Sequence, residues 1–113
     1  MENLAGKRCK PCEGGVEPLG RAEAETLLSS LQEGWNLTDD DLAIEREFRF
    51  PAYARTIAFA NAVAFIATNE GHHPVLTVGY GFCRVFYTTT AINGLSDNDF
   101  ICAAKIDRLA SEL

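Results

Sequence analysis

The sequence predicts an α+β fold in the order αββαββα, with a four-stranded antiparallel sheet and three helices packed on one face. Two observations lead to this prediction. Segments with apolar residues at helical spacing are separated by pairs of alternating segments, and short turn-forming stretches join the members of each pair into hairpins. The chain of 113 residues is long enough for one core. Such a sheet leaves its second face available to solvent, to another subunit or to a ligand.

The first half of the chain is predicted to form one helix and one hairpin. Residues 21–34, RAEAETLLSSLQEG, have leucines at helical spacing, and Gly34 is expected to end the helix. Residues 35–50, WNLTDDDLAIEREFRF, follow as a hairpin that turns at residues 39–41. One face of its second strand is apolar and the other charged; the two sets are Leu42, Ile44, Phe48 and Phe50, and Glu45, Glu47 and Arg49.

The second half repeats this order and adds a final helix. Residues 51–71 are predicted to be the longest helix, with Pro51 at the first helical position and Gly71 after the last turn. Its many apolar residues, Phe65 among them, predict that it is largely buried. Residues 72–90 then form two strands joined near residues 79–81. A last helix begins after Ser96, with Asp99 three residues later as a carboxylate variant of the capping box.

The N-terminal residues have a different composition from the rest. Residues 1–20 are rich in proline and glycine and predict an arm, whereas residues 21–113 form the domain. Cys9 and Cys12 form a CxxC motif, but no strand precedes it as in a redox motif. Cys83 and Cys102 lie in apolar patterns and are expected to be buried, so structural zinc is not favoured. Weak metal binding by Cys9 and Cys12 between subunits stays open.

Charge and hydropathy exclude several classes of partner. The net charge of −6 argues against binding nucleic acid or an anionic membrane surface. No apolar run approaches the roughly 20 residues that a membrane span needs, and the first residues lack the apolar stretch of a secretion signal. We therefore expect a cytoplasmic protein without a membrane partner.

His72 and His73 are the two histidines of the chain, and Pro74 follows them. They lie between a predicted helix and a predicted strand. Adjacent side chains in a strand point to opposite faces, unless the restriction that Pro74 imposes bends the chain. An imidazole exchanges protons near neutral pH and suits acid–base catalysis. The alternative is that a histidine caps the end of the helix. Zinc is not favoured, because a third protein ligand is not evident nearby.

These residues carry a resemblance to a known family. EGHHP at residues 70–74, Tyr80, GLSDNDF at 94–100, GW at 34–35 and FANAVAFIA at 59–67 resemble pterin-4a-carbinolamine dehydratases. The resemblance implies a homodimer or tetramer that removes water from a 4a-hydroxytetrahydropterin, by acid–base catalysis without metal or other cofactor. It assigns catalysis to His72 and His73, and substrate binding to Pro74 and Tyr80.

Two positions depart from the family pattern, and both are threonine. Thr68 stands where the family has an acidic or otherwise charged residue, and Thr90 stands where it has a third catalytic histidine. The family's aspartate is retained as Asp99, although its capping role explains its presence equally well. Losing one positioned acid or base lowers a rate by about 10²- to 10⁴-fold. The sequence therefore predicts a degenerate active site.

The predicted open sheet face indicates a protein partner. Arg84, Phe86, Thr88 and Thr90 are expected on one face of the last strand, and an exposed aromatic residue there would suit protein contacts. Alternatively, a neighbouring subunit covers Phe86. Resemblance to a family branch without the third histidine implies an assembly factor for ribulose-bisphosphate carboxylase/oxygenase (RuBisCO) in alpha-carboxysome bacteria.

The leading hypothesis is accordingly an assembly chaperone with RuBisCO subunits as partners. It would be cytoplasmic or carboxysome-associated and would keep at most residual pterin binding. Two alternatives stay open. The protein could be an active dehydratase that uses His72, His73 and a water held by Thr90, or a dehydratase that also serves a regulator as a dimerisation cofactor.

Overall fold

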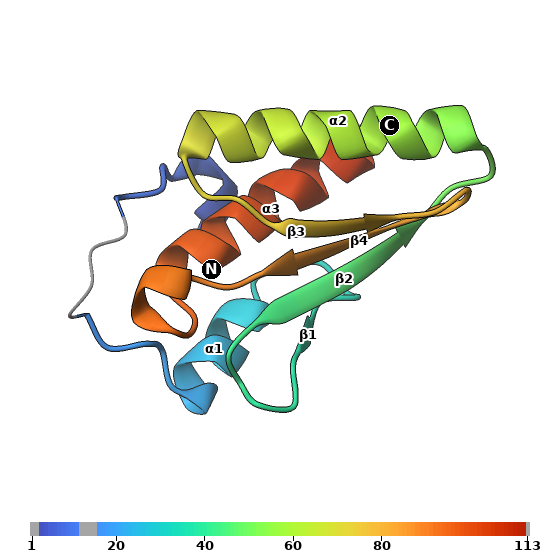
Figure 1. Cartoon of the computed structure of the whole chain (residues 1–113). Helices are drawn as coiled ribbons and strands as arrows, with labels where there is room; N and C mark the ends of the chain where they lie inside the picture. The colour runs from blue at the N-terminus through green and yellow to red at the C-terminus, as the bar shows by residue number, and fades with distance from the viewer. Residues whose placement is uncertain (1–2, 12–15, 113) are drawn as a thin grey trace.

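The computed structural model describes residues 3–11 and 16–112. Its main elements occur in the predicted order αββαββα (Figure 1). The helices are α1 (Arg21–Leu28), α2 (Tyr53–Glu70) and α3 (Asp97–Ser111), and the strands are β1 (Asn36–Leu37), β2 (Ile44–Arg49), β3 (Val75–Val78) and β4 (Phe82–Tyr87). Two short 3-10 helices, η1 (Leu4–Gly6) and η2 (Thr90–Ile92), complete the set. The predicted α+β fold class is confirmed.

The four strands form one antiparallel sheet in the order β1-β2-β4-β3. Helix α2 lies between β2 and β3 in the chain, and the β3–β4 hairpin returns so that β4 pairs with β2. Strand β3 is therefore an outer edge of the sheet. Register places Arg84 between Glu47 and Thr77 on the face away from the helices.

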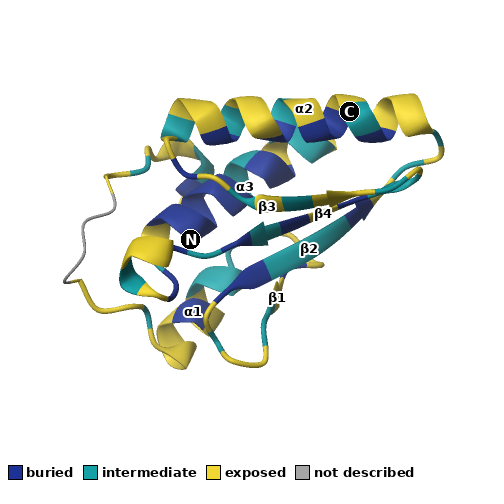
Figure 2. Ribbon diagram, viewed as in Figure 1, coloured by how far each residue is buried: buried dark blue, intermediate teal, exposed yellow. Residues whose placement is uncertain are grey.

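The core lies between the helices and the other face of the sheet, where the buried residues gather in Figure 2. All three helices and both long strands contribute to it: Ala24 from α1, Phe59 and Val63 from α2, Phe100, Ala103 and Ile106 from α3, and Ile44, Phe48, Val85 and Tyr87 from β2 and β4. Cys83 and Cys102 are buried here, as predicted. Alternation along β4 thus sets which side chains face the core and which stay available.

Helix α2 differs from its prediction in two respects. It begins at Tyr53 with Ala52 as N-cap, so placing Pro51 at the first helical position was wrong. Phe50 N–H still donates to Gly81 O, so sheet pairing continues up to Pro51 and the helix begins later. The prediction that α2 is largely buried was also wrong, because α2 packs through one face and leaves Phe65 67% exposed. Gly71 ends the helix as predicted, at φ 66°.

Helix α1 is shorter than its periodicity predicted. It ends at Leu28 instead of continuing to Gly34. Beyond it the chain is held by α3, because Gln32 N–H and the indole N–H of Trp35 both donate to the Asp107 carboxylate, at 3.0 and 2.8 Å. The hairpin that follows is confirmed, although its first strand has two residues.

The N-terminal segment packs against the domain. Leu4 of η1 is buried, and Lys105 Nζ of α3 donates to Ala5 O at 2.9 Å. The boundary between an arm of residues 1–20 and a domain of residues 21–113 stays a prediction. Cys12 lies outside the described residues. In the part of the chain that the structure describes, no helix is long and apolar enough to cross a membrane.

Candidate active site

A pocket of about 250 Å³ opens where β4 ends and β3 begins. Its walls come from three segments that are distant in sequence: the turn after α2, the start of β3, and the end of β4 with η2. The lining residues are Gly71, His72, His73, Val75, Phe86, Thr88, Thr89, Thr90 and Ala91. The fold thus brings together the two histidines and Thr90.

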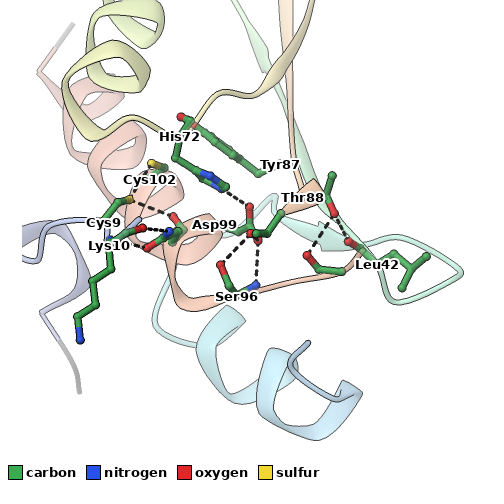
Figure 3. A network of polar contacts seen from close by, with 12 residues as sticks. Cys9, Lys10, Leu42, His72, Tyr87, Thr88, Ser96, Asp99 and Cys102 are labelled. Atoms are coloured by element: carbon green, nitrogen blue, oxygen red, sulfur yellow. Dashed lines mark hydrogen bonds and ion pairs between the residues drawn. The ribbon is translucent and has the colours of Figure 1, made fainter. Parts of the chain in front are cut away.

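His72 forms the buried wall of this pocket and is 6% exposed. The left-handed conformation of Gly71 turns the chain out of α2, and the main-chain N–H of His72 caps the helix by donating to Ala67 O at 3.2 Å. The imidazole Nε2 lies 2.6 Å from Asp99 Oδ1 (Figure 3). Its ring stacks on Tyr87, with centroids 5.2 Å apart. The histidine is therefore held from two sides.

Asp99 is fully buried and combines the two roles that the sequence left open. Its Oδ1 binds His72, and its Oδ2 accepts hydrogen bonds from Ser96 N–H at 3.0 Å and from the Thr89 hydroxyl at 2.8 Å (Figure 3). The bond to Ser96 is the predicted capping interaction at the start of α3. One carboxylate thus caps the start of α3 and orients the imidazole of His72.

The surroundings of His72 favour its charged form. Burial by itself lowers the pKa of His72, but the hydrogen bond and the charge of Asp99, with a further contribution from Cys102, raise it above the usual imidazole value. The Tyr87 hydroxyl donates to His72 O at 3.2 Å. The imidazole of His72 at the pocket wall therefore holds a proton more readily than an ordinary imidazole.

His73 lines the same pocket but is exposed to solvent. The adjacent histidines thus occupy different surroundings, in agreement with the alternation expected of an extended chain. Pro74, between the lining residues His73 and Val75, is half-buried. Of the two imidazoles, that of His73 is the more accessible to a ligand.

The three threonines after β4 differ from one another. β4 ends at Tyr87, so Thr88 and Thr90 lie beyond the strand, but both line the pocket with Phe86, as their predicted common face implies. The Thr88 hydroxyl donates to Leu42 O, while Thr90 begins η2 and is exposed at the pocket.

Sequence reasoning missed Thr89, which is buried and donates to Asp99. It continues the every-second-residue series of buried residues after Cys83, Val85 and Tyr87, and that signal could have identified it.

Two other predicted site residues lie outside the pocket lining. Thr68 is exposed on α2, where its hydroxyl donates to Ala64 O at 2.9 Å. Tyr80 is 71% exposed in the β3–β4 turn and lies near Tyr53, with ring centroids 6.0 Å apart. This turn is at the opposite end of the hairpin from His73. One chain therefore does not bring Tyr80 to the histidines.

On the predicted interaction surface, Arg84 already has a hydrogen-bond partner within the chain. Arg84 Nη2 donates to Glu47 Oε1 at 3.0 Å across the β2–β4 pair. Phe86 is half-buried, and Val75 beside it in register is 61% exposed. An apolar strip thus runs from the pocket to the sheet edge.

Within residues 3–11 and 16–112, no three His, Cys, Asp or Glu side chains are grouped closely enough to hold a metal ion. The pocket offers imidazoles, hydroxyl groups and apolar carbon atoms. Groups of this kind can exchange protons with a small ligand.

Comparison with known proteins identifies the family. The sequence model of the family pterin 4 alpha carbinolamine dehydratase matches residues 17–109. A protein of Nitrosomonas eutropha, provisionally named pterin-4-alpha-carbinolamine dehydratase, is 58% identical over 107 residues, which are 95% of this chain and 93% of the relative. A Legionella pneumophila protein with the same provisional name is 49% identical, with 95% of each chain covered.

Two solved structures also resemble the chain. The transcriptional coactivator/pterin dehydratase of Brucella melitensis has a TM-score of 0.78 and 29% identity, and the match covers 83% of this chain and 99% of that one. A pterin dehydratase-like protein identified as a RuBisCO assembly factor in the alpha-carboxysome has a TM-score of 0.61 and 24% identity, with 70% and 92% covered. At that identity the likeness concerns the fold alone. The chain belongs to the pterin-4-alpha-carbinolamine dehydratase family.

Proposed function

We propose that the pocket binds a 4a-hydroxytetrahydropterin and catalyses its dehydration, at a rate reduced by the absence of an imidazole at position 90. The observation that carries this proposal is the assembly of His73, Thr90 and the buried His72–Asp99 pair around one cavity. The volume of about 250 Å³ suits a small bicyclic ligand, and the half-buried Phe86 offers it an apolar wall.

His73 is the group that we assign to proton transfer. In the reaction the C–O bond to the 4a-hydroxyl breaks and a ring nitrogen loses a proton, so that one molecule of water is removed overall and the ring proton returns through solvent to His73. Protonated His73 gives its proton to the departing hydroxyl, and a water molecule at Thr90 accepts the ring-nitrogen proton. His72 is held by Asp99, so its role is to supply positive charge beside the leaving oxygen.

The first test compares the parent with His73→Gln and His72→Gln in a 4a-hydroxytetrahydropterin dehydration assay. We expect His73→Gln to lower kcat by about 10²-fold, as for loss of one positioned acid or base. Thr68→Val is the control, because Thr68 is exposed outside the pocket. Equal rates for all four proteins and for the uncatalysed reaction would refute the proposal.

RuBisCO assembly is the second candidate, favoured by Thr68 and Thr90 at family positions that usually carry charge or imidazole. The solved structure of a relative with that role is similar to this chain in fold, and this similarity does not indicate that RuBisCO is a partner of this chain. Co-expression with a carboxysomal RuBisCO tests it: an unchanged yield of soluble, active carboxylase would exclude the role. The α2 variant Phe65→Ser separates this role from a coactivator function, which would use the exposed helix face and not the sheet.

Self-association would explain how Tyr80, which is distant from the histidines of its own chain, can take part in the site. β3 is an edge strand without charged residues, and Val75 and Val78 are exposed on it. Antiparallel pairing of two β3 strands sets the end of one beside the start of the other, so Tyr80 of one copy approaches the pocket of its partner. Val78→Lys is expected to yield monomers in light scattering and to weaken pterin binding. A monomeric parent would exclude this arrangement.

A further inference from the structure

Cys9 and Cys102 lie next to each other behind the candidate active site. Their sulfur atoms are 3.5 Å apart, although 93 residues separate them in sequence (Figure 3). Cys102 is fully buried in α3, whereas Cys9 is half-buried in the N-terminal segment and retains access to solvent. The dehydration mechanism uses neither thiol. Cys12, the other cysteine of the CxxC motif, lies outside the described residues, and among the described residues the fold places Cys102 beside Cys9.

Hydrogen bonds from the main chain of Cys9 and Lys10 to side chains of α2 and α3 hold the N-terminal segment in place without a covalent link. Cys9 N–H donates to Glu70 Oε1 at 2.8 Å. The next residue exchanges two bonds with one side chain: Lys10 N–H donates to Asn98 Oδ1 at 3.0 Å, and Asn98 Nδ2 donates to Lys10 O at 2.7 Å. The backbone is thus fastened at Cys9 and directly after it, which keeps the sulfur of Cys9 at Cys102.

We propose that Cys9 and Cys102 form a reversible disulfide when the protein meets a low-molecular-weight disulfide of the glutathione type. A disulfide bond is about 2.05 Å long, so the two sulfur atoms need to approach by about 1.5 Å. Small rotations of the two cysteine side chains and of the N-terminal segment can supply that movement. The bond would join the N-terminal segment to α3.

The exchange is balanced in protons and electrons. The hydrogen bond to Cys102 and burial raise the pKa of the Cys9 thiol, so the first step is slow at neutral pH and begins when this thiol loses its proton to solvent. The Cys9 sulfur then attacks one sulfur of the reagent R–S–S–R, which breaks the S–S bond and releases R–S⁻. The Cys102 thiolate then attacks Cys9 Sγ and expels the second R–S⁻. The two cysteines lose two protons and two electrons, and the reagent is reduced to two R–SH. The half-buried Cys9 reacts first because Cys102 is inaccessible to the reagent.

The disulfide would change the surroundings of His72. The hydrogen bonds from Cys9 and Tyr87, with the charge of His72, lower the pKa of Cys102, and negative charge on Cys102 in turn raises the pKa of His72. The titratable groups around His72 are Asp99 and Cys102 of α3 and Tyr87 of β4. Oxidation removes the contribution of Cys102 and leaves that of Asp99, so the pKa of His72 is expected to fall.

The test does not depend on the proposed function. The full chain is equilibrated in a buffer of oxidised and reduced glutathione and quenched with acid, and its intact mass and its peptides are measured without reduction. We expect the loss of two hydrogens and a peptide that links Cys9 to Cys102. Cys12→Ser and Cys83→Ala should keep this product, whereas Cys9→Ser and Cys102→Ala should lose it. NMR titration of His72 should then give a lower pKa in the oxidised parent.

Three results would overturn the proposal. They are a link from Cys9 to Cys12 in place of Cys102, a glutathione adduct that stays on Cys9 of the folded parent, and a parent that is unchanged in the most oxidising buffer. If Cys102→Ala fails to fold, Cys9→Ser decides the question, because Cys9 lies outside the core.

Discussion

Helix α3 carries two buried carboxylates, Asp99 near its start and Asp107 near its end, and their partners differ. Asp99 binds an imidazole, a hydroxyl group and a main-chain N–H. Asp107 accepts from the Trp35 indole, from Gln32 N–H and from Arg46 Nη1 at 2.8 Å. The partners of Asp107 keep their protons at neutral pH, whereas His72 can exchange one. A buried carboxylate therefore indicates a reactive site only when its partner titrates.

Replacing each carboxylate separately should cause the largest losses of unfolding free energy. The two losses should show which carboxylate stabilises the fold more. Asp99→Ala leaves His72 and Thr89 buried without their shared acceptor, so we expect the free energy of unfolding to fall by about 3–5 kcal/mol. Asp107→Ala should lower it by about 2–3 kcal/mol, because the partly exposed Arg46 can turn to water. Urea denaturation measures both. A larger loss for Asp107→Ala would contradict this comparison.

Thr89→Val tests the hydroxyl that supports Asp99. The substitution keeps the side-chain shape but removes the donor to Oδ2, so we expect a loss of about 1–3 kcal/mol in unfolding free energy. Thr88→Val is the neighbouring control, because the Thr88 hydroxyl binds Leu42 O and not a carboxylate. Equal effects of the two substitutions would show that Thr89 has no special importance for Asp99.

The pH dependence of the unfolding free energy should distinguish Asp99, whose partner His72 titrates, from Asp107. Because the pKa of His72 is raised in the folded protein, its charge stabilises the fold fully below the unfolded imidazole pKa of about 6.5. That contribution is lost as pH rises through the higher folded value. We therefore expect unfolding free energy to decrease above about pH 6.5. His72→Gln should abolish this slope and His73→Gln should keep it.

Asp107 should give a second decrease of stability with rising pH, in the acid range. Burial raises the pKa of Asp107 in spite of its hydrogen bonds. Its ionisation therefore disfavours the fold as pH rises from about 3.8 through that raised value.

The Arg84–Glu47 pair on the open sheet face should give the smallest effect. Arg84 is 44% exposed in its side chain, and such ion pairs contribute about 0–1 kcal/mol. We expect Arg84→Ala to change the unfolding free energy by less than about 1 kcal/mol. A loss as large as that for Thr89→Val would mean that this face is packed against another subunit in solution, and light scattering would then detect the assembly.

The sequence predicted the fold well because its signals are local. The spacing of leucines, the alternation along β2 and β4, Gly71 and the capping pair Ser96 and Asp99 depend on nearest neighbours. The end of α1 and the start of α2 were misplaced because long-range hydrogen bonds decide them. In one of them Gln32 N–H donates to Asp107, and in the other Phe50 N–H donates to Gly81 O.

The site was predictable in its residues but not in its arrangement. His72 and His73 could be found from the HHP motif, and Thr90 from the resemblance to the family, and the three residues line one pocket. Asp99 binds Thr89 and His72, and Cys9 lies beside Cys102. These contacts join segments that are distant in sequence, and no local sequence pattern indicates that such segments lie close together.

The most direct test of a weakened dehydratase site is the rate of 4a-hydroxytetrahydropterin dehydration by the parent and by Thr90→His. Thr77→His, which places the same side chain on the open sheet face outside the pocket, is the matched control. We expect slow turnover by the parent, a gain of at least about 10²-fold in Thr90→His, and no gain in Thr77→His. A parent that already turns over as fast as Thr90→His, or two proteins that are both inactive, would contradict the role assigned to position 90.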